Sequence, residues 1–160
     1  MGPSTRSGKQ NGVTCGDVRT AAVASSPIAS LHLDTMRMRT TETGQMWIDG
    51  EGIVHFVATG AASTADTAAD NLAVLEELTA GGKTAILFDV RSWPSGSPAF
   101  WVRFINAVEH ICLAGAILVD PQSQDNLGTF PSLISSLLVP LQVFLDEDEA
   151  LAFLRNHLSS

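Results

Sequence analysis

Residues 85–90 read Ala-Ile-Leu-Phe-Asp-Val, an almost unbroken apolar run that decides the fold class of this chain. A strand has this pattern when both of its faces are covered, because neither face meets water. Residues 116–119 read Ala-Ile-Leu-Val and form a second run of the same kind, which Asp120-Pro121 ends. Two such strands with helical sequence between them predict a parallel sheet that is covered by helices.

Helical periodicity separates these runs and continues after them. Ser63 is the expected N-cap of a first helix, Ser97 caps a second beside Pro98, and Asp146 caps the last. A third helix is weakened by Pro131 in its first half. The four helices are expected between Ser63 and Gly81, from Ser97 to about Ile111, at about 125–138, and from Asp146 to Leu158.

Two shorter apolar stretches, at 46–49 and 53–58, flank the sequence Asp-Gly-Glu-Gly. Glycine beside aspartate supplies the positive φ angles of a tight turn, so these stretches are expected to pair as an antiparallel hairpin. A last strand is expected at 141–145. The order is therefore β-β-α-β-α-β-α-β-α, which predicts an α/β fold with a mixed sheet and right-handed crossovers.

The composition excludes two classes of partner. A net charge of −8 leaves no basic footprint for nucleic acid, and it disfavours an anionic membrane surface. No apolar stretch reaches the roughly 18 uninterrupted residues that a membrane span requires. With 160 residues, of which 45% are apolar, the chain suits a single domain with a filled core.

Charge also divides the chain near Gly44. Residues 1–43 are rich in Gly, Ser, Thr and Arg and carry a positive net charge, whereas residues 44–160 are strongly acidic. The first segment has too little apolar sequence to offset the entropy of ordering, so we expect it to be disordered. A targeting segment, or a reading frame that truly starts at Met36 or Met38, are the alternatives. The domain is expected at 44–160.

The two cysteines, Cys15 and Cys112, share no metal-like spacing. A disulfide framework is therefore not expected, and a reducing cytoplasm fits this cysteine usage best. The sequence indicates no cofactor and no metal.

Three segments together resemble a known bacterial group, the STAS/SEC14-like family of the SpoIIAA-like fold. They are Trp47-x-x-x-Glu51-Gly52-Ile53, then residues 86–90, then residues 140–154 with the pattern Pro-x-x-x-Phe-x-Asp-Glu-x-Glu-Ala-Leu-x-Phe-Leu. The resemblance covers about residues 45–158 and implies a compact binding or regulatory domain, usually without catalysis. The lipid-binding name of the group also implies a small apolar ligand as an alternative.

The same resemblance bears on Ser97. In anti-sigma-factor antagonists of this topology, a serine in an Asp-Ser-Ser-Gly-type motif starts the second helix and is phosphorylated. The equivalent region here, residues 91–98, reads Arg-Ser-Trp-Pro-Ser-Gly-Ser-Pro and lacks that motif. Ser97 is therefore a candidate helix cap or phosphoacceptor, with Arg91 as a potential phosphate partner.

Two further sets of residues are candidate sites. Asp89 and Asp120 end neighbouring strands at the sheet edge where open α/β sheets bind ligands, and they form a candidate acidic site. Aspartates at the start of loops are also common for plain turn chemistry, and that is the favoured interpretation of these two. Trp93, Ser95 and Trp101 form a candidate interaction surface if the tryptophans are exposed, and otherwise the rings belong to the core.

No complete catalytic set is visible. The sequence Gly82-Lys83-Thr84 lacks the earlier glycine of a P-loop and precedes a strand, so it is interpreted as a helix end. The histidines are scattered, and no nucleophile elbow is present. We therefore expect a non-catalytic regulatory or protein-interaction domain whose partner is another protein or a second copy. The alternatives are a small apolar-ligand domain and a phosphoserine-switched protein.

Overall fold

The computed structural model describes residues 37–94, 98–122, 124–127 and 130–160, and these form a mixed sheet in the order β1-β2-β3-β4-β5-β6. The first three strands pair antiparallel and β3 to β6 pair parallel. The expected α/β class with a mixed sheet is therefore confirmed. The strands are β1 (Arg39–Thr40), β2 (Gly44–Ile48), β3 (Val54–Ala58), β4 (Thr84–Asp89), β5 (Cys112–Leu118) and β6 (Leu141–Phe144).

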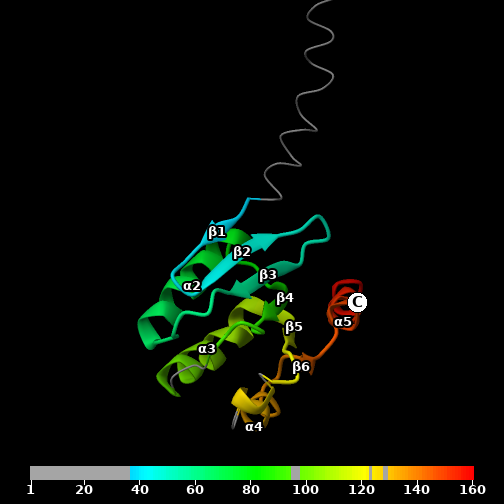
Figure 1. The fold of residues 1–160 in the computed structure, drawn as a ribbon. Coiled ribbons are helices and arrows are strands. Elements are labelled where there is room, and N and C mark those ends of the chain that lie inside the picture. Colours follow the sequence, from blue (N-terminus) through cyan, green and yellow to red (C-terminus); the bar gives the residue numbers. More distant parts are fainter. Residues whose placement is uncertain (1–36, 95–97, 123, 128–129) are drawn as a thin grey trace, which may run out of the picture. The chain divides into compact units, whose positions relative to one another are not determined.

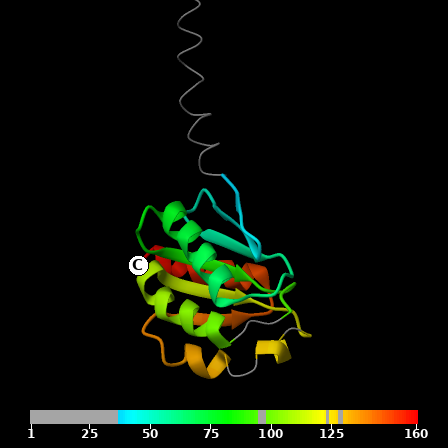
Figure 2. The same ribbon diagram turned by 90° about the vertical axis from the view of Figure 1, so that its left-hand side faces the viewer.

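Helices cover both faces of this sheet, as Figures 1 and 2 show. One face is covered by α2 and α3, and the other by α5, which packs against β4, β5 and β6. The helical elements are α2 (Ala65–Thr79), α3 (Pro98–Ile111), the 3-10 turn η1 (Gln124–Leu127), α4 (Phe130–Ile134) and α5 (Glu147–Leu158). None of the helices in the described ranges has the length and apolar character needed to cross a membrane.

The helix ends follow from local hydrogen bonding. Thr64, and not Ser63, is the N-cap of α2, because its hydroxyl accepts from the Thr67 N–H while the Thr67 hydroxyl bonds back to the Thr64 N–H. Ala80 ends this helix in the left-handed conformation. Asp146 caps α5 as expected, accepting from the N–H of Glu149.

The expected third helix is much shorter than residues 125–138. Among the described residues of this stretch, only η1 and α4 are helical, and α4 ends at Ile134. The Ser135 and Ser136 hydroxyls donate to carbonyls three residues earlier, and the N–H of Ser136 also turns back three residues. These bonds compete with the helical pattern and tighten the chain into a turn.

The sheet begins before Gly44. Arg39 and Thr40 pair with β2, and the side chain of Thr43 is buried. Their polar composition and charge predict that they belong to the N-terminal segment, and that prediction is wrong for residues 37–43. Residues 37–43 therefore belong to the folded domain, while residues 1–36, on which most of the disorder prediction falls, lie outside the described residues.

Candidate apolar-ligand pocket

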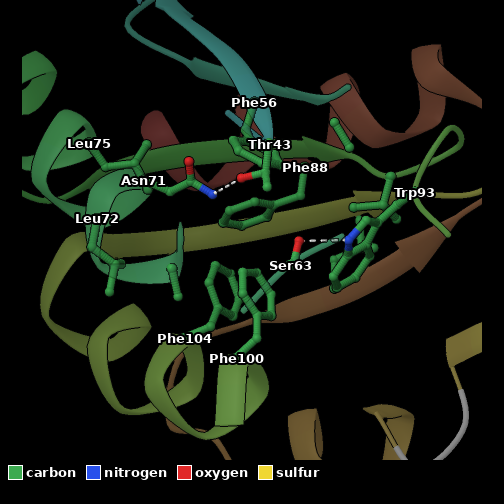
Figure 3. A pocket seen from close by; sticks show the side chains of 14 residues that line it. Thr43, Phe56, Ser63, Asn71, Leu72, Leu75, Phe88, Trp93, Phe100 and Phe104 are labelled. Carbon is green, nitrogen blue, oxygen red and sulfur yellow. Dashed lines mark hydrogen bonds between the residues drawn. The ribbon is translucent and has the colours of Figure 1, made fainter. Parts of the chain in front are cut away.

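A cavity of about 40 Å³ lies between the α2–α3 layer and the sheet. Figure 3 shows the side chains around it, which come from strands, helices and loops on this side of the sheet. Most of them are apolar or aromatic, and none is charged. The lining residues are Thr43, Phe56, Ala58, Ser63, Ala68, Asn71, Leu72, Leu75, Phe88, Val90, Trp93, Phe100, Phe104 and Ile117.

Four aromatic rings form one wall. Phe100 and Phe104 are stacked on α3 with ring centroids 6.0 Å apart and planes 7° from parallel. Phe88 of β4 meets Phe104 edge-on at 5.1 Å, and Trp93 tilts against Phe100 at 5.3 Å. Such pairs add roughly 0.5–1.5 kcal/mol each beyond the area they bury. The wall is thus held in place by its own ring contacts.

A glycine shapes the opposite side of the pocket. A Cβ atom added to Gly44 of β2 would lie 2.3 Å from the ring of Phe56 on the paired strand. No real Cβ contact is that short, so the ring can occupy its position only because residue 44 has no side chain. The sequence therefore sets the shape of this wall through one missing methyl group.

The lining contains polar side chains at two places. At each place, these side chains form hydrogen bonds with neighbouring side chains. The Trp93 indole Nε1–H donates to Ser63 Oγ at 2.8 Å. The Asn71 amide donates to Thr43 Oγ1 at 2.9 Å, and its carbonyl oxygen accepts from Thr41 at 2.6 Å. These bonds fix the rings and α2 relative to the sheet.

The size of the cavity limits what it accepts. A water molecule needs about 10–15 Å³ of such volume, whereas an engineered cavity that binds benzene measures about 150 Å³. At about 40 Å³, this pocket accommodates a group of only a few heavy atoms without rearrangement. A ring-sized ligand would therefore require side chains of the lining to move.

The expected interaction surface is not supported at Trp93. Its ring is only 9% exposed, and it packs on Phe100 and bonds to Ser63. The core alternative is therefore correct for this residue. Ser95 and Ser97 lie outside the described residues, and Trp101 lies in α3 without a described side chain.

One of the two strand-end aspartates, Asp89, is paired with an arginine. Arg91 donates from Nε and Nη2 to the Asp89 carboxylate at 2.9 and 2.6 Å, and its Nη2 lies 3.6 Å from Glu147. Hydrogen bonding to Asp89, reinforced by the charges of Glu147 and Asp120, raises the pKa of Arg91. Asp89 is thus paired with a cation of the chain itself. Arg91, the candidate phosphate partner, is in turn paired with that carboxylate.

A further cluster fastens the β2–β3 hairpin. The rings of Trp47 and His55 are stacked 5.0 Å apart, and His55 Nε2 lies 2.8 Å from Asp49 Oδ2. Burial opposes ionisation of Asp49, but bonds from His55 and two backbone N–H groups lower its pKa. Within the described ranges, no three His, Cys, Asp or Glu residues are grouped in a way that could hold a metal.

The polar part of the pocket is not among the sites that the sequence predicts. Asn71 is buried between Ala68 and Leu75, so a polar residue on the apolar stripe of α2 was the available signal. Thr43 lies in the segment that is predicted to be disordered, and the sequence predicts only a helix-cap role for Ser63. No sequence pattern indicates that their side chains would meet one cavity.

Comparison with known proteins places the chain in a family. One solved structure is similar, with a TM-score of 0.47 and 17% identity over 74% of this chain and 91% of that one. It is described as an uncharacterized protein from the DUF3478 family with a SpoIIAA-like fold, from Shewanella loihica PV-4. The comparison with curated proteins gave no match. A family model described as Domain of unknown function (DUF7793) matches residues 46–158, and the chain therefore belongs to that family.

Proposed function

We propose that this domain binds a small apolar molecule and does not transform it. The observation that carries the proposal is the uncharged, largely aromatic cavity between α2, α3 and the sheet. Ligand sites are concave and mostly apolar, with a few placed polar groups, and this cavity has that character on a small scale.

The size of the cavity also sets the expected affinity. Even the most efficient small ligands gain no more than about 1.5 kcal/mol per non-hydrogen atom. A molecule of three or four such atoms therefore gains at most about 4.5–6 kcal/mol, which corresponds to a dissociation constant between about 0.5 mM and 40 μM. Binding must be measured at correspondingly high ligand concentrations.

The test is an NMR titration of the full chain with propane, whose three heavy atoms match the size of the cavity. Ala68 lines the cavity and Ala73 is exposed on the same helix, so Ala68→Leu fills the pocket while Ala73→Leu is the matched control. We expect signals of pocket residues to shift in the wild type and in the control, and to remain unchanged in Ala68→Leu. Equal shifts in both variants would show that the cavity is not the binding site.

A protein-interaction function is the second candidate, and a different surface favours it. Three large apolar side chains around α3 and α4 are exposed: Val102 by 60%, Leu133 by 40% and Leu138 by 92%. The N–H of Leu138 bonds to Glu109 on α3 at 3.1 Å, so this segment is fastened to the helix. Another protein or a second copy of the chain would cover such side chains.

Sedimentation and pull-down with the full chain test this second candidate. Leu138→Ser is expected to weaken self-association or partner capture. Leu145→Ser, which removes another exposed leucine outside this surface, serves as control. Identical behaviour of the two variants would count against an interface at α3 and α4.

A further inference from the structure

We propose that the ligand of the pocket is a nonpolar gas, a molecule of about two to four heavy atoms without any hydrogen-bonding group. Short alkanes, short alkenes and the nonpolar diatomic gases form this class. The inference rests on the proposed binding function and specifies the chemistry of its ligand. It follows from the atoms that form the cavity wall, from the volume that they enclose and from the contacts that fix this volume.

Carbon atoms form almost all of the wall that faces the cavity. The polar atoms of the lining are bonded to neighbouring side chains instead. Trp93 donates to Ser63, and Asn71 donates to Thr43. The carbonyl oxygen of Asn71 also accepts from Thr41. Figure 3 shows the first two of these bonds beside the cavity. A molecule inside therefore meets hydrocarbon surface and not a hydrogen-bonding group.

This wall disfavours any ligand that carries a polar group. A hydroxyl, an ether oxygen or a carbonyl gives up hydrogen bonds to water when it enters the cavity. The carbon wall replaces none of these bonds, and burial of a polar group without a partner is unfavourable. The same holds for water, which needs about two to four polar partners in a protein interior. A molecule without hydrogen-bonding groups escapes this penalty and gains dispersion contacts with the surrounding rings.

The volume of the cavity then limits the ligand to a gas. About 40 Å³ is roughly three times the 10–15 Å³ that one water molecule requires, so about two to four heavy atoms fit. Molecules of this size that have no hydrogen-bonding group are gases under ordinary conditions. The size and the polarity of the site therefore point to the same class of ligand.

The aromatic wall holds the cavity at this size. Phe104 stacks on Phe100 and meets Phe88 edge-on. Trp93 is held by Phe100 on one side and by its bond to Ser63. Because each ring contacts another, no ring can move outward without breaking a contact of its neighbour. The site is therefore expected to select its ligand by size as well as by polarity.

The test compares propane with dimethyl ether, which has the same number of heavy atoms and nearly the same shape but carries an oxygen. Both dissociation constants are measured by NMR titration of the full chain, of Ser63→Ala and of Thr43→Val. We expect propane to bind the wild type about 5- to 150-fold more tightly, the effect of one buried polar group without a partner. The ratio of the two constants should be unchanged in both variants, because neither hydroxyl reaches the ligand.

Three results would contradict these expectations in different ways. Ether binding as tight as propane binding in the wild type would overturn the inference, while the proposed function would stand. Weaker ether binding relative to propane in Ser63→Ala or Thr43→Val would also overturn it, because a hydroxyl would then contact the ligand. Failure of both molecules to bind the wild type would instead remove the proposed function.

Dissolved dioxygen tests the diatomic gases separately from the hydrocarbons. Dioxygen is paramagnetic, so it speeds the nuclear relaxation of the methyl groups that it contacts. We expect a larger effect on the Ala68 methyl, which is buried and lines the cavity, than on the Ala73 methyl, which is exposed on the same helix. A smaller effect on Ala68 than on Ala73 would overturn the inference for the diatomic gases and restrict the class to hydrocarbons.

Discussion

At the scale of single residues, burial determines the chemistry of Cys112. It starts β5, and its burial raises the pKa of the thiol to about 12. A thiol with that pKa is neither a nucleophile nor a metal ligand near neutral pH, because the thiolate is the reactive form. The residue therefore acts as a small apolar side chain of the core.

The raised pKa of Cys112 predicts a loss of stability in alkali. The thiol keeps its proton in the folded state, while in the unfolded chain it ionises near pH 8.5–9. Its contribution is therefore complete below that pH and falls as the pH rises toward 12. Between pH 8 and 10 we expect urea unfolding to show a loss of about 1–2 kcal/mol that Cys112→Ala lacks. The same slope in the variant would assign the loss to other groups.

Ser97 gives a second prediction at this scale. Helix α3 begins at Pro98, directly after Ser97, and Arg91 is already paired with Asp89. We therefore expect Ser97 to act as a cap and not as a phosphorylation switch. Ser97→Ala should lower the unfolding free energy by roughly 0.5–2 kcal/mol and Ser97→Asp by little.

Partner binding separates the two roles of Ser97, provided that both variants are folded. Equal affinity of Ser97→Ala and Ser97→Asp for a partner is the expected result. Different affinities of the two variants would instead support a phosphorylation switch at Ser97.

At the scale of elements, the sequence predicts the bounds of α3 and α5 well, but it misses β1 and places the start of β5 at residue 116, four residues after Cys112. Buried strands follow from continuous apolar runs, and residues 85–90 correspond to β4 within one residue. The N-cap of α2 is Thr64 and not the expected Ser63, although both residue types are good caps. Thr64 forms the capping box with Thr67, while the Ser63 hydroxyl accepts from Trp93. The apolar stripe at 127–137 overstated a helix that local serine bonds end at Ile134.

The role of Thr64 as the N-cap of α2 can be tested directly. Thr64→Ala removes the hydroxyl that accepts the Thr67 N–H, so we expect a loss of about 1 kcal/mol of stability in urea unfolding, with the cavity retained. Ser63→Ala should cost stability through Trp93 instead, and it should also change the environment of that indole. If Trp93 fluorescence changed equally in both variants, the two hydroxyls would not have separate roles.

At the scale of the whole molecule, the pocket depends on contacts that no linear pattern reveals. Its lining joins Thr43, before β2, to Ile117 in β5, and the rings define the space by how they stack. The sequence supplied the apolar stripes and the element order. The cavity arises from the way those stripes meet, including the fit of Phe56 over Gly44.

The N-terminal boundary of the folded domain can be tested by truncation. Removal of residues 1–35 leaves β1 and the Thr43–Asn71 bond in place, so we expect the melting temperature to stay within about 2 °C of the full chain. Removal of residues 1–43 deletes that strand and the buried Thr43, and it leaves Asn71 without its acceptor. One kcal/mol shifts the melting temperature of such domains by about 2–8 °C, so the longer truncation should lower it by several degrees. A comparable drop for the shorter truncation would show that the first 35 residues also stabilise the domain, and the boundary would then lie earlier still.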